Sequence, residues 1–175
     1  MKTLLPGAIA LVAFLGLMAP VPVNAMGEGD TTSTTTTCPK GKVWDKKKKA
    51  CVKATSGVLP DEDLYQQGRS LALAGHYDDA LAVLALVTNQ ADPRVLNYTG
   101  YANRKAGRFE VAFSYYQKAL AIDPNFVLAR EYLGEGYVAQ GRVDLAKAQL
   151  VEIAARCGTT CEEYQELSQN IAASD

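Results

Sequence analysis

Small residues recur at a spacing of 32 and then 34 residues along the carboxyl-terminal two-thirds of this 175-residue chain. Three glycines, Gly68, Gly100 and Gly134, open the pattern, and a second glycine follows each of them seven positions later. An alanine and a large side chain then follow in register. These later columns are Gly75, Gly107 and Gly141, then Ala80, Ala112 and Ala146, then Leu84, Tyr116 and Leu150. Self-similarity at such a period indicates stacked copies of one supersecondary unit.

The residue types in these columns predict paired helices. A glycine inside a helix costs about 1 kcal/mol relative to alanine, which is tolerable where a neighbouring helix must approach the backbone closely. The second glycine of each unit fits a left-handed residue at the end of the first helix. Asp92-Pro93 and Asp123-Pro124 are typical helix starts, with aspartate as the cap and proline in the first turn. Each unit is therefore predicted to be a helix, a tight turn and a second helix.

The columns resemble the tetratricopeptide repeat, which has small residues at its eighth and twentieth positions, an aromatic or large apolar residue at the twenty-fourth and proline near the thirty-second. The middle unit matches best, through Gly100, Ala112, Tyr116, Ala119 and Pro124. The first unit is two residues short, and the third lacks the closing proline. The resemblance implies an all-α solenoid of three antiparallel helix pairs in a right-handed superhelix with a concave face. The three units would span residues 61–92, 93–126 and 127–160.

Residues 161–175 are expected to form a capping helix and a short tail. Thr160 and Glu163 have the spacing of a capping box. Tyr164, Leu167 and Ile171 recur at helical spacing and give the segment one apolar face. A repeat array leaves its last apolar face bare, so a terminal helix that covers this face is expected.

The amino-terminal segment predicts export. Lys2 precedes an uncharged apolar run from Leu4 to Ala19, and Val23-Asn24-Ala25 offers small residues for cleavage. This order is typical of a secretory signal peptide over residues 1–25, which would be in the membrane only transiently. An uncleaved membrane anchor is the alternative, although the run is short for a span. Residues 26–37, rich in threonine, are expected to form a disordered leader. The expected location is the periplasm, beyond the inner membrane.

Four cysteines occur as two close pairs, Cys38 with Cys51 and Cys157 with Cys161. An even number of cysteines in an exported chain favours disulfides, here two local ones. Metal binding is the alternative, but neither pair is a C-x-x-C motif and the single histidine, His76, is distant in sequence from both. We therefore expect two disulfides, no metal site and no cofactor.

Residues 38–53 read as a basic hairpin closed by its disulfide, and residues 54–60 as a linker. The hairpin has a net charge of +6, whereas residues 61–175 have a net charge of −6. The acidic body has no basic stripe, which argues against nucleic acid as a partner. The hairpin could contact anionic envelope polymers or lipid headgroups through its charges, or could be a solvated turn. A weak resemblance to chitin-binding modules implies sugar stacking on the tryptophan. The contact residues would be Trp44, Lys46, Lys47, Lys48 and Lys49.

No catalytic set is found in the sequence. The chain has no spare histidine base, no G-x-S-x-G string, no phosphate-binding loop and no H-E-x-x-H string. His76 lies at a predicted repeat turn, where polar residues are ordinary. We therefore expect a protein that is not an enzyme.

In the tetratricopeptide-repeat family, ligands usually lie against the first helix of each pair. The resemblance therefore implies a groove that would suit an extended peptide carrying both charges; a solvated face without a ligand is the alternative. The groove positions are Tyr65, Arg69, Asn97, Tyr101, Arg104, Lys105, Glu131 and Glu135. The carboxylate clamp of chaperone-binding members is absent, because its positions hold Tyr65, Arg69, Tyr98, Leu128 and Tyr132.

The sequence thus predicts a non-enzymatic protein–protein adaptor of the bacterial cell envelope that binds a peptide or protein segment in its groove. The alternative is an envelope-polymer binder that uses the basic hairpin as the contact and the repeats as a scaffold. The pattern leaves the oligomeric state open.

Overall fold

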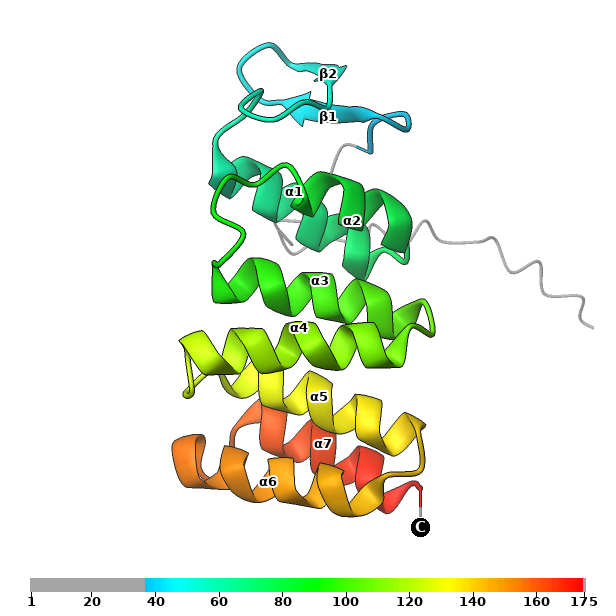
Figure 1. Ribbon diagram of the computed structural model, residues 1–175, viewed down its shortest axis with the longest axis vertical. Coiled ribbons are helices and arrows are strands. Elements are labelled where there is room, and N and C mark those ends of the chain that lie inside the picture. Colours follow the sequence, from blue (N-terminus) through cyan, green and yellow to red (C-terminus); the bar gives the residue numbers. More distant parts are fainter. Residues whose placement is uncertain (1–36, 175) are drawn as a thin grey trace, which may run out of the picture. The chain divides into compact units, whose positions relative to one another are not determined.

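The computed structural model describes residues 37–174 (Figure 1). The predicted signal peptide and all but the last residue of the predicted leader lie outside this range. Within it, no helix combines the length and the apolar character that a membrane span needs. Two strands and seven helices follow one another: β1 (Lys42–Asp45), β2 (Ala50–Lys53), α1 (Asp61–Leu73), α2 (Tyr77–Leu84), α3 (Pro93–Lys105), α4 (Phe109–Ile122), α5 (Val127–Ala139), α6 (Val143–Cys157) and α7 (Glu162–Ala172).

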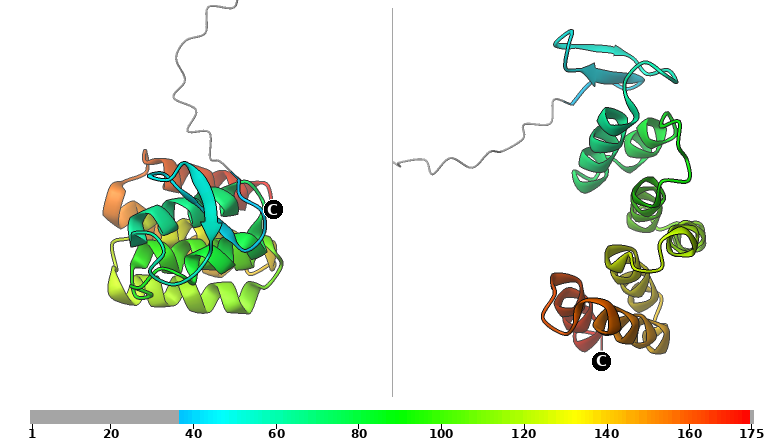
Figure 2. Two further views of the ribbon diagram at one scale, coloured as in Figure 1. Left: turned by 90° about the horizontal axis from the view of Figure 1, so that it is seen from above. Right: turned by 90° about the vertical axis from the view of Figure 1, so that its left-hand side faces the viewer.

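The helices form three stacked antiparallel pairs, α1 with α2, α3 with α4 and α5 with α6 (Figure 1). First helices also contact one another from unit to unit, α1 with α3 and α3 with α5. Beyond its own partner, the second helix of a pair contacts the first helix of the next pair, α2 with α3 and α4 with α5. In Figure 2 (right), α1 lies to the left of α2, and α3 lies to the left of α4. The predicted all-α repeat array preceded by a small hairpin is therefore confirmed.

The glycines inside the first helices allow the two helices of a pair to touch. A Cβ built on Gly100 would lie 2.7 Å from Cε1 of Tyr116, whose ring is fully buried in α4. Gly68 is approached in the same way by Leu84. The turn glycine of the middle unit, Gly107, has φ 80° and ends its helix in the left-handed conformation, as predicted.

The Gly100→Ala substitution is expected to destabilise the protein by about 1–3 kcal/mol, because the added methyl group overpacks a core ring that cannot move away. Urea unfolding followed by circular dichroism measures this change. The penalty should shrink in a Tyr116→Leu background, which removes the ring. Equal penalties in both backgrounds would show that the contact with Tyr116 is not the cause.

Two of the predicted helix caps are wrong. The Asp92 carboxylate does accept a hydrogen bond from the main-chain N–H of Arg94 and caps α3. Asp123, however, is the last residue of the α4 turn and accepts from the N–H of Asn125, so that α5 begins only at Val127. The predicted capping box at Thr160 is also absent, because Cys161 is the N-cap of α7 and makes no side-chain cap bond.

The terminal helix α7 packs against both α5 and α6. Leu167, fully buried, takes the place against Gly134 that the repeat pattern assigns to Leu150: a Cβ on Gly134 would lie 2.6 Å from Cδ2 of Leu167. Ile171 lies in the same core cluster as Leu133 and Ile153. Helix α7 thus covers the last apolar face of the array, as the sequence predicts for a capping helix.

The hairpin covers the opposite end. Val43 is 1% exposed and joins the core formed by Leu59 and Leu64. The strands pair antiparallel with Trp44 opposite Cys51, and the predicted Cys38–Cys51 disulfide closes them. The hairpin is therefore part of the packed array at its amino-terminal end and not a free basic knob.

Candidate functional site

Five tyrosines gather where α1, α3 and α5 meet, and we call them the tyrosine cluster: Tyr65, Tyr98, Tyr101, Tyr116 and Tyr132. The ring of Tyr98 lies 6.0 Å from Tyr65 and 6.1 Å from Tyr101, and Tyr101 lies 5.0 Å from Tyr132, between centroids. Tilted and edge-on pairs at these distances are favourable. Except for Tyr116 of α4, the rings come from first helices, so the cluster lies on the face where these helices contact one another.

Arginines hold the edges of the cluster. The Nε of Arg69 donates a hydrogen bond to the Tyr98 hydroxyl at 2.8 Å, and its guanidinium lies 5.3 Å from the centre of that ring. Arg94 lies over Tyr65 at 4.6 Å and pairs with Asp92 and Glu62. These cation–π contacts fix the rings and the charges relative to one another.

Arg104 is the most enclosed cation of the group, with a side chain that is 9% exposed. It forms an ion pair of 2.5 Å with Glu135 of α5 and donates a hydrogen bond of 3.3 Å to the Tyr116 hydroxyl. Burial alone would lower the pKa of Arg104, but Tyr116 and Glu135 stabilise the charged form and the pKa is raised. Arg104 therefore joins α3, α4 and α5 and is occupied by internal partners.

Glu131 is buried at the contact between α5 and α7, with 2% of its surface exposed. Burial, a hydrogen bond with Glu166 and the nearby charges of Glu135, Glu166 and Glu163 raise the pKa of Glu131 to about 9. Two carboxyl groups can share a hydrogen bond only if one of them carries a proton. Its Oε1 atom has no hydrogen-bond partner within the described residues. Burial and the neighbouring carboxylates therefore favour the protonated form of Glu131.

The predicted groove positions all come from the first helices, but they differ in exposure. Asn97 is fully buried, and neither amide atom has a partner among residues 37–174. Asn97 and Glu131 are therefore closed off from direct contact with a partner, and Tyr65 and Arg104 are also buried. The accessible part of the set is Arg69, Tyr101, Lys105 and Glu135, with the Lys105 ammonium 6.0 Å from the Tyr101 ring.

Sequence reasoning did not assign Tyr98 and Tyr132 to the site. In the family pattern both occupy positions of the missing carboxylate clamp, yet in the structure they connect the rings of the cluster. The signal that could have found them is their spacing. They occupy the same position of consecutive units, 34 residues apart, on the helix face next to Asn97 and Glu131.

The predicted hairpin contact residues are partly used inside the protein. Gln67 of α1 accepts from the N–H of Trp44 at 2.7 Å and donates to its carbonyl at 3.0 Å, and the indole is half-buried. Lys46 pairs with Asp63 of α1 at 2.8 Å. Lys48 pairs with Asp45 within the turn at 3.6 Å. Lys47 and Lys49 are exposed. Any contact of the hairpin with an anionic polymer stays a prediction.

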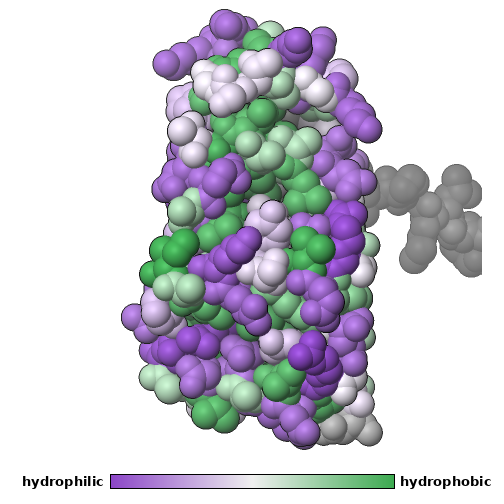
Figure 3. All heavy atoms as spheres, in the orientation of Figure 1, coloured by the Kyte–Doolittle hydropathy of each residue, from purple (hydrophilic) through white to green (hydrophobic). Residues whose placement is uncertain are grey.

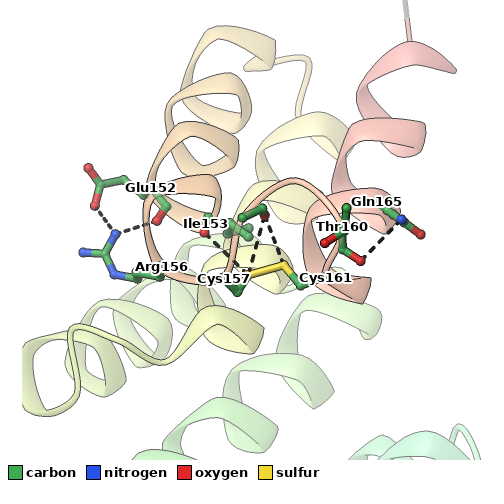
Figure 4. Close-up of a disulfide and its surroundings, with 8 residues drawn as sticks. Glu152, Ile153, Arg156, Cys157, Thr160, Cys161 and Gln165 are labelled. Atoms are coloured by element: carbon green, nitrogen blue, oxygen red, sulfur yellow. Dashed lines mark hydrogen bonds and ion pairs between the residues drawn. A yellow bond between two sulfur atoms is a disulfide. The ribbon is translucent and has the colours of Figure 1, made fainter.

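The second predicted disulfide, Cys157–Cys161, joins the end of α6 to the start of α7 (Figure 4). The sulfur atoms and the Glu163 carboxylate form the one group among residues 37–174 with spacing for a metal ion. Both sulfurs are bonded to each other, however, and a thiolate is the form that binds metal. The Cys157–Cys161 disulfide therefore holds the start of α7 against the end of α6.

Comparison with known proteins agrees with this architecture. Residues 104–171 match the family model described as tetratricopeptide repeat. No curated protein matches the chain significantly. Solved structures with a similar fold include the Yersinia enterocolitica type III secretion chaperone SycD in complex with a peptide of the translocator YopD, at 22% identity and TM-score 0.56, covering 68% of this chain and 93% of that chain.

Two further structures hold a bound segment. PcrH in complex with the chaperone-binding region of PopB has 23% identity and TM-score 0.55, covering 69% of this chain and 99% of that chain. The first repeat domain of Spaghetti (RPAP3), bound to an HSP90 peptide, has 20% identity and TM-score 0.56, covering 65% and 91%. Identities this low show a common fold. Residues 104–171 therefore match the tetratricopeptide-repeat model, and the helix pairs from Asp61 onwards share the fold of these structures.

Proposed function

We propose that this protein is a non-enzymatic adaptor that binds a peptide or protein segment on the face formed by α1, α3 and α5. The observation that carries the proposal is the tyrosine cluster with its fixed cations. Arg69 is already bonded to Tyr98, and Lys105 already lies against Tyr101. Side chains ordered before binding lose less conformational entropy when a ligand arrives, so they favour affinity.

The accessible groups define what the ligand should look like. Tyr101 offers a half-exposed aromatic surface for an apolar side chain, and Arg69 and Lys105 offer positive charges. Glu135 is 19% exposed and already neutralised by Arg104, so it adds little negative charge to the face. The preferred ligand is therefore an extended segment with an apolar residue next to acidic ones. The peptide complexes of SycD, PcrH and RPAP3 support this use of the fold.

The cell-envelope location belongs to the same proposal. The predicted signal peptide and the two disulfides support an oxidising compartment such as the periplasm, since structural disulfides are rare in the cytosol. In this compartment the adaptor would bring an exported partner to another envelope component.

Binding on this face is tested by in-cell photo-crosslinking. A photoreactive phenylalanine at position 101 should crosslink a partner that mass spectrometry identifies. The Tyr101→Ala and Lys105→Ala variants should then bind the partner-derived peptide at least about tenfold more weakly in fluorescence anisotropy, because each loses an interface contact worth more than about 1 kcal/mol.

The matched control is Lys118→Ala. Lys118 is an exposed lysine of α4 that lies over Tyr115 at 5.1 Å, as Lys105 lies over Tyr101, but on a second helix. The Lys118→Ala variant should leave the affinity for the peptide unchanged. If Lys105→Ala and Lys118→Ala weaken binding equally, the first-helix face is not the binding site. The same conclusion follows if position 101 yields no crosslink.

A further inference from the structure

A cleft of about 190 Å³ lies between the hairpin and the first helix pair. This is smaller than the roughly 300–1,000 Å³ of a typical small-molecule site, so it suits one side chain of a larger ligand better than a cofactor. Hydrophobic residues gather below the hairpin on the face drawn in Figure 3. The hairpin wall consists of residues 37–42 and Ala54, and the helix wall of Gln67, Leu71, Asp78, Asp79, Ala82 and Val83.

The walls of the cleft are mainly apolar. Leu71 of α1 and Val83 of α2 lie on the helix side, and Pro39, Ala54 and the disulfide-bonded Cys38 face them from the hairpin side. The lining carries no buried unpartnered polar atom that would require a polar ligand inside. An apolar side chain entering this space would be favoured by about 25 cal/mol per Å² of surface that it removes from water.

The hairpin presents an incomplete strand edge to the cleft. The main-chain N–H and carbonyl of Trp44 point away from β2, because both bind the Gln67 side-chain amide. Gln67 therefore takes the place of a third strand at that residue. Since main-chain groups alternate along a strand, the carbonyl of Lys42 lies on the same edge. The N–H of Lys42 donates to the Pro39 carbonyl, whereas the Lys42 carbonyl accepts no hydrogen bond within residues 37–174.

The charges at the rim differ between the two walls. Lys40 and Lys42 are exposed on the hairpin wall, and neither has an ion-pair partner among residues 37–174. On the helix wall Asp78 is paired with Arg108 at 3.2 Å, whereas Asp79 has no such partner in that range. The hairpin carries a net charge of +6 overall. An acidic residue on the ligand would therefore be attracted to the hairpin side and repelled from the α2 side.

We propose that this cleft is a second peptide site, which binds an extended segment of a partner protein. The segment places one apolar side chain among Leu71, Ala82 and Val83, sets an acidic residue beside Lys40 and Lys42, and donates a main-chain N–H to the Lys42 carbonyl. This site is separate from the first-helix face and uses an edge strand in the manner of β-strand addition.

The test selects peptides from a displayed library of random octapeptides on the protein with its hairpin intact, and measures the enriched peptides by fluorescence anisotropy. Peptides that pair an apolar with an acidic residue are expected. Ala82→Phe places a ring in the cleft from an exposed helix position, and should weaken binding by about tenfold to a hundredfold, the value of one buried apolar side chain.

The matched control is Ala85→Phe, at an exposed position of the same helix end that does not line the cleft. It should bind like the wild type. A Lys40→Glu/Lys42→Glu variant provides an independent route, because it should weaken acidic peptides without filling the cleft. Circular dichroism confirms that each variant is folded.

Three outcomes would overturn the proposal. The library could yield no enriched peptide, Ala82→Phe could bind as well as Ala85→Phe, or binding could be abolished by Tyr101→Ala instead. The last outcome would assign the peptides to the first-helix face and leave the function proposed above intact. If position 101 yields no crosslink while peptides still bind in the cleft, the first-helix face is rejected and the cleft is retained. The two proposals can therefore fail separately.

Discussion

Arg104→Ala is expected to destabilise the protein by about 3–5 kcal/mol, the range measured when one partner of a buried ion pair is removed. The substitution leaves the Glu135 carboxylate and the Tyr116 hydroxyl without the cation that both contact. It also removes a guanidinium that lies 5.5 Å from the Tyr101 ring and 5.4 Å from the Tyr132 ring. Urea unfolding monitored by circular dichroism gives the free energy directly.

Arg94→Ala is the matched control for this experiment. Arg94 also lies over a tyrosine and also has carboxylate partners, but its side chain is 48% exposed. Exposed pairs contribute at most about 1 kcal/mol, so the control should change stability little. A loss of less than about 1 kcal/mol for Arg104→Ala would show that the three helices do not depend on this cation. An alanine at position 104 also cannot test ligand binding, because it alters the fold beneath the site.

Glu131→Gln is expected to change how stability depends on pH. The pKa of Glu131 is about 9 in the folded protein and near 4.5 when unfolded, so folding takes up a proton between these values. The stabilisation by the protonated form is complete below about pH 4.5 and is lost as pH rises towards 9. The wild-type free energy of unfolding should therefore fall by up to about 1.4 kcal/mol per pH unit in this interval.

The glutamine variant keeps the shape and the hydrogen-bonding capacity of a neutral carboxyl group without the proton. Its stability should depend less on pH between 5 and 8 than that of the wild type, and it should be the more stable protein at pH 8. Glu162→Gln, an exposed glutamate of the first turn of α7, should show the wild-type slope. Parallel curves for wild type and Glu131→Gln would mean that Glu131 is ionised in the folded state.

The repeat register was predictable because it depends on local chemistry. Gly107 ends α3 through its own left-handed conformation, which does not depend on distant residues. Gly100 and Ala112 are small because the two helices of one pair pack closely. The capping role predicted for Asp123 was wrong because this residue has two possible uses. It can cap the next helix or accept a bond in the turn that ends α4, and only the packing of the following pair decides between them.

The burial of the site residues could not be predicted in the same way. Asn97, Arg104 and Glu131 occupy groove positions in the repeat pattern, and the resemblance implies that their side chains contact a ligand. Their environment depends on residues distant in the sequence. Arg104 is buried by its contacts with Tyr116 and Glu135, and Glu131 is buried where α7 packs against α5. The packing of the hairpin depends likewise on Gln67, which no local pattern marks as a main-chain partner of Trp44.

The hairpin and α7 determine where further repeat units could be added to this protein. Val43 of the hairpin covers the apolar end of the first helix pair, and Leu167 of α7 covers that of the third. Neither end of the described array therefore offers an exposed apolar surface on which another repeat could stack. Additional units would have to be inserted between the hairpin and α7, not added beyond them. Lengthened variants are therefore best engineered by duplicating an interior segment such as 93–126, with both terminal elements retained.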